Sequence, residues 1–261
     1  MSAGKTIGID RLVELRWLDA VAAQVSAGKP VADVYRFAWD LLEGEVRGND
    51  PHSGRGKTAT VLMRIWAKTP PELVPLRDHG LCLLEASPGG NSLAAHWGMA
   101  MATHAFFFDV ATAIGRVLAL QEQVALAQIG RRVAERWGER PTIKTACRRL
   151  VRSIVRWRAL DDPTGKGLFR KIEKPIPVEG LAALFLVDAL LHSVDGGAAP
   201  FSALLTHPAL FPFQVPLSLG ELRTSGRFEV DREGLEIEMV RRAPRTDAWQ
   251  HVNERNGHGS Q

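Results

Sequence analysis

Residues 141–178 read PTIKTACRRLVRSIVRWRALDDPTGKGLFRKIEKPIPV, and they decide the fold that we expect. The first half predicts a helix from Thr142 to Trp157, because apolar residues recur at helical spacing and Pro141 suits a first turn. The other side of this helix is basic. A glycine-containing turn, DDPTGKG, then leads into the alternating stretch LFRKIEKPIPV, and together they predict a β-hairpin.

A second amphipathic helix precedes the basic one. Its helical periodicity runs from Val124 to Trp137, and the turn Gly138–Pro141 separates the two helices. A helix, a tight turn, a basic helix and a basic hairpin follow one another in a winged helix-turn-helix. The major groove of DNA admits one helix, and cationic side chains hold such a helix against the phosphates. The order of elements therefore predicts a module that binds duplex DNA.

Positive charge is concentrated in the same region. The 261 residues carry 33 basic and 29 acidic side chains, a net of +4. Residues 131–174 hold 14 basic and 5 acidic ones, a net of +9, whereas residues 1–120 hold 12 of each and residues 175–261 hold 7 basic and 11 acidic. This asymmetry indicates a polyanionic partner. A solvated helix face would explain the charge alone, but not its coincidence with the helix-turn-helix order.

We expect the chain to be mainly α. Residues 1–120 predict an N-terminal helical bundle, in which the apolar stretch 93–123 forms one or two central helices. Residues 121–178 are the predicted winged helix-turn-helix. Residues 179–243 predict a helix followed by a small β-containing cap, and residues 244–261 a disordered tail.

The stretch Ser53–Trp66, SGRGKTATVLMRIW, contains Gly-Lys-Thr, the end of a Walker A phosphate loop. The first glycine of that motif would fall at Pro51, which has no N–H and cannot take the positive φ of a glycine. The residues before it predict a helix rather than the required strand. We therefore interpret the segment as a basic loop that leads into a helix beginning at Ala59, with Thr58 as its cap.

No residues in the sequence have the spacing of a known catalytic or metal centre. His96 and His104 lie eight positions apart, about 12 Å along a helix, which is too far to share one metal ion. H-E-x-x-H, paired C-x-x-C and G-x-S-x-G motifs do not occur in the sequence. The leucines around Cys82 indicate a buried, inert thiol. We therefore expect a protein that is not an enzyme and that has no cofactor and no metal.

The sequence favours a cytoplasmic protein without a membrane partner. No cationic start followed by an apolar core is visible at the N-terminus, and two cysteines do not make a disulfide scaffold. The most apolar run, Ala100–Leu120, carries Asp109 and Arg116. Because charged groups are costly in a bilayer, we interpret this run as a buried helix.

Three loose motifs together resemble a known family. A basic loop, Arg55–Thr58, precedes a helix that ends in Arg64–Trp66; Phe106–Phe108 lies in the apolar middle; and Thr145–Leu150 has the pattern T-x-x-R-x-L. This order is similar to that of BrxA, the small helical protein of BREX bacteriophage-exclusion systems. The resemblance covers roughly residues 10–195, and the β-rich end departs from it. It implies an antitermination-factor-like helical bundle joined to a winged helix, and binding to DNA.

We therefore expect a DNA-binding component of a BREX-like antiphage defence system, with double-stranded DNA and other defence proteins as partners. The residues expected to contact DNA are Thr142, Lys144, Thr145, Arg148, Arg149, Arg152 and Arg156 in the basic helix, Lys166, Arg170 and Lys171 in the wing, and Arg55 and Lys57 in the basic loop. Two alternatives stay open. One is a winged-helix transcriptional repressor whose bundle dimerises or senses a ligand, and the other is an assembly adaptor for defence-system proteins. The oligomeric state does not follow from the sequence.

Overall fold

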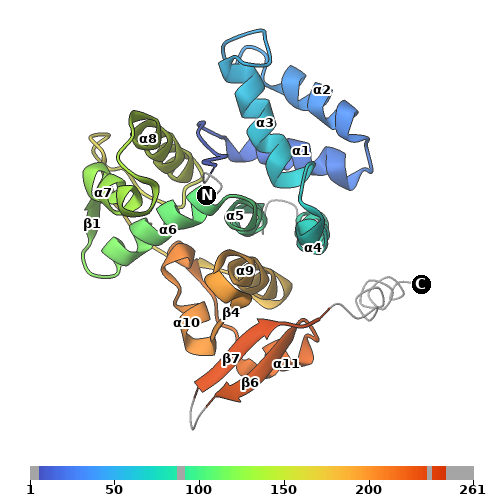
Figure 1. Cartoon of the computed structure of the whole chain (residues 1–261), viewed down its shortest axis with the longest axis vertical. Helices are drawn as coiled ribbons and strands as arrows, with labels where there is room; N and C mark the ends of the chain where they lie inside the picture. Colours follow the sequence, from blue (N-terminus) through green and yellow to red (C-terminus); the bar gives the residue numbers. More distant parts are fainter. Residues whose placement is uncertain (1–5, 87–91, 234–236, 245–261) are drawn as a thin grey trace.

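The structure of the protein is a computed structural model that describes residues 6–86, 92–233 and 237–244. This part of the chain is mainly helical (Figure 1), and its described strands form three small sheets. The helices of the first half are α1 (Leu15–Ser26), α2 (Val31–Leu41), α3 (Gly54–Trp66), α4 (Val74–Ala86), α5 (Ser92–Thr103) and α6 (Ala105–Leu118). Figure 1 shows α1–α3 as one layer, with α4–α6 beside it. The predicted mainly helical fold is confirmed.

The basic region begins with a strand rather than a helix. β1 (Gln123–Ala125) precedes α7 (Leu126–Trp137), α8 (Pro141–Arg156) and β2 (Leu168–Arg170). β1 pairs antiparallel with β2, so that Val124 lies opposite Phe169. The prediction of a helix from Val124 was therefore wrong at its first two residues, because helical periodicity carries no information about a strand partner 45 positions away.

The hairpin predicted after α8 forms only in part. A β-bridge joins Asp161 to Arg170 across the turn, which places Arg170 between Asp161 and Gln123. The stretch after β2 does not continue this hairpin. Instead β3 (Ile176–Pro177) pairs in parallel with β5 (Phe213–Gln214), which attaches the end of the basic region to the C-terminal part.

The C-terminal part packs on the bundle through a buried helix. Ten consecutive residues of α9 (Gly180–Ser193) are buried, and they lie against α5. Gly98 allows this close approach, because a Cβ there would lie 2.4 Å from Cε1 of Phe185. After α9, a sheet in the order β4-β7-β6 is formed by β4 (Ala198–Pro200), β7 (Ile237–Arg242) and β6 (Phe228–Glu233), with α10 (Phe201–Leu205), η3 (Pro208–Leu210) and α11 (Leu219–Thr224) between these strands in the chain.

In the described part of residues 179–243 a helix, α9, is followed by short strands and short helices. The tail predicted for residues 244–261 lies outside the described residues from position 245 onward. One apolar cluster includes buried residues from each of the predicted segments 1–120, 121–178 and 179–243, for example Ile9, Leu150 and Val240. The basic region is therefore held by the same core as the bundle.

The helix α3 starts earlier than its sequence suggested. Ser53 is its N-cap and accepts a hydrogen bond from the amide of Gly56 at 3.4 Å, whereas Thr58 lies inside the helix and donates to the carbonyl of Gly54 at 2.9 Å. The prediction of a helix beginning at Ala59 was wrong, because Ser53 is an equally good cap one turn earlier. The loop Gly48–Ser53 is correspondingly short.

Candidate nucleic-acid interface

The basic helix α8 has one side in the core and two different polar sides. The buried residues of this helix are Ile143, Ala146, Cys147, Leu150, Val151, Ser153 and Ile154. Helical geometry turns the remaining side chains away from the core, but neighbouring segments decide which of them reach the surface.

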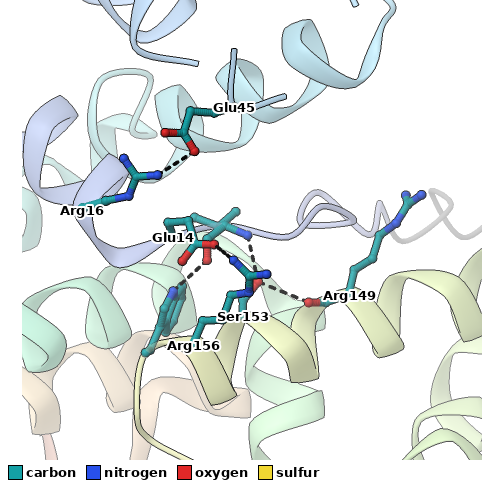
Figure 2. Close-up of polar contacts among 8 residues, drawn as sticks. Glu14, Arg16, Glu45, Arg149, Ser153 and Arg156 are labelled. Atoms are coloured by element: carbon teal, nitrogen blue, oxygen red, sulfur yellow. Dashed lines mark hydrogen bonds and ion pairs between the residues drawn. The ribbon is translucent and has the colours of Figure 1, made fainter. Parts of the chain in front are cut away.

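One polar side of α8 lies against the N-terminal segment before α1 (Figure 2). The amide of Val13 donates to Oγ of Ser153 at 2.9 Å, and Nε1 of Trp157 donates to the carbonyl of Val13 at 2.9 Å. Arg156 forms an ion pair with Glu14, which Figure 2 shows beside Ser153. On the same side, the guanidinium of Arg149 donates to a backbone carbonyl, that of Asp10, at 3.1 Å.

Arg149 and Arg156 therefore have intramolecular partners. Arg149 is half-buried, and the carboxylate of Glu14 offsets the charge of Arg156. Both were predicted to contact DNA, but in this structure they attach α8 to the N-terminal segment. Phosphate binding by either would have to compete with these contacts.

The other polar side of α8 is an exposed cationic stripe. Lys144, Arg148 and Arg152 follow one another at intervals of four residues, so they share one face of the helix over two turns, about 12 Å. All three are exposed, and none of them has an ion-pair partner among the residues that the structure describes. Thr142 is exposed in the first turn of the same helix.

A groove of about 700 Å³ runs beside this stripe. Lys144, Thr145 and Arg148 of α8 line it, together with Arg131 of α7 and Lys166 of the turn before β2. The remaining lining is small and mostly apolar: Ala125, Leu126, Ala127, Gly130, Ala134, Cys147 and Gly167, with Glu139 as an acid. Four cations against one carboxylate leave a net of +3 in the groove. The positive charge attracts anions to the groove.

The remaining wing residues differ from Lys166. Arg170 donates from Nε to Oδ2 of Asp161 at 2.7 Å, across the bridge that closes the hairpin. This ion pair reduces the charge that Arg170 offers to a partner. Lys171 is exposed directly after β2. Of the predicted wing residues, Lys166 alone lines the groove.

The structure separates the predicted loop residues from this groove. Arg55 is 5% exposed; its Nε donates to the carbonyl of Trp39 at 2.8 Å, and its guanidinium lies 4.5 Å from the centre of the Trp39 ring. The prediction that Arg55 contacts DNA from a surface loop is thus replaced by a packing role against α2. Lys57 is exposed, but Figure 1 shows the beginning of α3 at the outer end of the α1–α3 layer, away from α7 and α8.

Sequence reasoning missed Arg131. The amphipathic pattern of α7 indicated that this side chain is exposed, but not that its side of the helix faces α8. Its signal in the sequence is its place in the segment of net positive charge. The groove and the α8 stripe together carry five cations that have no ion pair within the described residues: Arg131, Lys144, Arg148, Arg152 and Lys166.

Other candidate centres do not gain support. In the described part of the chain no cluster of three or more His, Cys, Asp or Glu side chains could hold a metal ion. Burial raises the pKa of Cys147 to about 12, so this thiol stays protonated beside the groove. Cys82 is exposed, contrary to its predicted burial, whereas its neighbours Leu81 and Leu83 on α4 are buried. Among the described residues, no helix has the length and apolar character that crossing a bilayer requires.

Comparison with known proteins adds no relative. The chain matches no family model, no curated protein and no solved structure. The functional argument therefore rests on the residues of this chain.

Proposed function

We propose that the protein binds duplex DNA through α8 and the groove beside it, as a non-enzymatic component of a BREX-like antiphage defence system. The observation that carries DNA binding is the exposed stripe of Lys144, Arg148 and Arg152 next to a groove of net charge +3. These cations have no ion-pair partner among the described residues, whereas Arg149 and Arg156 on the other side of the helix have partners within the chain. The defence role rests on the BrxA resemblance alone.

The topology around α8 supports the proposal. The helices α6, α7 and α8 follow one another, with β1 between α6 and α7 and β2 after α8. β1 pairs with β2, and a β-bridge joins Asp161 to Arg170 of β2. A winged helix has this connectivity, with its third helix facing the major groove and its wing beside it. In this interpretation Lys166 lies in the wing and Ala125 precedes the N-terminus of the second helix.

The chemistry of the surface favours phosphate contacts over base recognition. Five cations of this surface have no ion-pair partner among the described residues, and each can neutralise one phosphate: Arg131, Lys144, Arg148, Arg152 and Lys166. Of the residues predicted to contact DNA, Thr142 and Thr145 are the ones with neutral hydrogen-bonding side chains. We therefore expect affinity that depends little on base sequence. With about five phosphates neutralised, the logarithm of the binding constant should fall with the logarithm of salt concentration at a slope of roughly −4.5.

The test is fluorescence anisotropy with a labelled duplex of random sequence, titrated from low to physiological salt. The triple variant Lys144→Ala, Arg148→Ala, Arg152→Ala should bind at least about tenfold more weakly, and its salt slope should be shallower by roughly 3. The matched control changes three exposed cations of the α1–α3 layer and its border to alanine, Lys29, Arg36 and Lys68, with the same loss of charge.

Two results would contradict the proposal. One is the absence of salt-dependent binding at low salt, which would favour the adaptor function instead. The other is an equal loss of affinity in the α8 triple variant and in the control, because net charge rather than the stripe would then explain binding. The defence role is tested separately by phage plating on cells that carry the wild-type gene or the α8 triple variant in its native operon. Equal plating would refute it without affecting DNA binding.

A further inference from the structure

A second cavity, of about 450 Å³, lies on the other side of α7 from the groove. It is bounded by α6, α7, the end of α9 and the residue before η3. Phe108, Thr112 and Arg116 contribute to its α6 wall at intervals of four residues, so they form one row along that helix. His207 also lines the cavity, and its ring stacks on that of Phe108, with centroids 5.4 Å apart and an interplanar angle of 16°.

The row and His207 bring hydrogen-bond donors together. Nδ1 of His207 accepts the amide hydrogen of Ala209 at 3.1 Å, so in the neutral ring the proton is on Nε2, which is a donor. Burial and, after it, the positive charge of Arg116 together lower the pKa of His207 from 6.5 to about 4, which places the guanidinium near the imidazole. The neutral, Nε2–H form of His207 is therefore the relevant one near pH 7.

Thr112 adds a hydroxyl to these donors. It is 8% exposed, and its Oγ1 is buried without a hydrogen-bond partner among the described residues. A buried hydroxyl without a partner costs free energy, so such groups call for an occupant or an explanation. Arg116, one turn further along the same face, has no ion-pair partner in the described part of the chain.

The acids of the cavity do not neutralise this end. Asp109 is already occupied, because one of its oxygens accepts from Arg136 at 2.7 Å and the other from Nε1 of Trp137 at 2.7 Å. Glu135 and Asp195 are exposed and lie on α7 and after α9, respectively, not in the α6 row. The α6 end of the cavity thus presents donors from two segments, and among the described residues Thr112 Oγ1 has no hydrogen-bond partner and Arg116 no ion-pair partner.

We propose that this cavity binds a small molecule through an anionic oxygen group, a carboxylate or a phosphate, held by Thr112, Arg116 and His207. The anionic oxygens of such a group accept hydrogen bonds, and the planar guanidinium matches both geometries. The stacked Phe108–His207 pair offers an apolar wall to the rest of the ligand. The inference goes beyond DNA binding and does not rest on it.

The probes are sodium phosphate and sodium succinate, each titrated by calorimetry into the full chain without DNA, at an ionic strength held constant with sodium chloride. We expect at least one to bind saturably, with a dissociation constant of about 10 mM or below. Binding of phosphate alone or of succinate alone identifies the anion, whereas absence of saturable binding by both overturns the proposal.

Two variants assign the binding to the α6 row. Arg116→Gln should weaken binding roughly tenfold, because a charge-assisted hydrogen bond is lost. Arg132→Gln, which removes a guanidinium from the α7 wall of the same cavity, is the matched control and should leave affinity nearly unchanged. The reverse order of effects would place the anion elsewhere and refute the assignment.

Thr112→Val separates a ligand contact from a structural role. Removing a hydroxyl that has no partner should raise the melting temperature of the free protein, while the anion affinity falls. A lower melting temperature, or unchanged affinity, would mean that the hydroxyl has a structural partner and no part in binding.

Discussion

Replacing Ser153 by alanine should destabilise the protein by removing one of the hydrogen bonds between α8 and the N-terminal segment. Ser153 is fully buried, and its Oγ accepts the amide hydrogen of Val13 at 2.9 Å while donating to the carbonyl of Arg149 at 3.2 Å. Alanine keeps the fit of the side chain, but it leaves the buried amide of Val13 without its acceptor. The lost contact joins positions 140 residues apart.

The magnitude follows from the cost of an unsatisfied buried donor, about 1–3 kcal/mol. Unfolding of 261 residues carries an entropy of roughly 0.5 kcal/mol/K at about 2.1 cal/mol/K per residue, so the melting temperature should fall by about 2–6 °C. Helix content should not change, because the backbone hydrogen bonds of α8 remain.

The assay is thermal and urea unfolding followed by far-ultraviolet circular dichroism. The matched control is Ser193→Ala: that hydroxyl is near the end of α9 and donates to the carbonyl of Ala189 at 2.8 Å, one turn back in its own helix. This control should change stability by less than about 0.5 kcal/mol. If Ser153→Ala is as neutral as the control, the amide of Val13 finds another partner and the reasoning fails.

Three further substitutions test other features. Gly115→Ala should lower the free energy of unfolding by about 3 kcal/mol in the same urea assay, because its Cβ would lie 1.9 Å from the carbonyl oxygen of Pro208. Gly130→Ala is the control and should be neutral or stabilising, because a Cβ there meets nothing within 4 Å. Equal effects of the two substitutions would refute the close packing at Gly115. Arg158 has a φ of 58° just after α8, so Arg158→Gly should leave the melting temperature unchanged or slightly higher, and a loss above about 1 kcal/mol would show that its side chain stabilises the fold. Burial and then the charge of Arg64 lower the pKa of His104 from 6.5 to about 4, so the neutral imidazole stabilises the fold fully above pH 6.5 and this stabilisation is lost as the pH falls toward 4. Between pH 7.5 and 4.5 the free energy of unfolding of His104→Gln should therefore fall by up to about 3 kcal/mol less than that of the wild type. Parallel pH profiles of the two proteins would contradict this.

The helical elements could be predicted well because helices are local. The apolar periodicity of α7 and α8, Pro141 in the first turn and the turn before it depend on residues within a few positions of one another. The break at His104 within the apolar middle is equally local, since the residue is the extended N-cap of α6. The concentration of charge in residues 131–174 is also a property of the sequence itself.

The candidate site could be predicted only as a set of residues on one helix. A helical pattern states which side chains point away from the core, but not which of them meet another segment. Arg149 and Arg156 are as basic as Arg148 and Arg152, and the difference lies in Asp10 and Glu14, far away in the chain. Arg55 shows the same effect, because the Trp39 ring covers it.

By itself, then, the sequence determined the helices, their order and the position of the positive charge, since these follow from short-range periodicity and composition. Tertiary structure alone decided which cations have an intramolecular ion pair. It also decided that Arg131, Lys144, Arg148 and Lys166 line one groove, and that Thr112 and His207 line a second cavity. The physical reason is that ion pairs, burial and cavities depend on contacts between distant segments. Such contacts arise only when the chain has packed into one core.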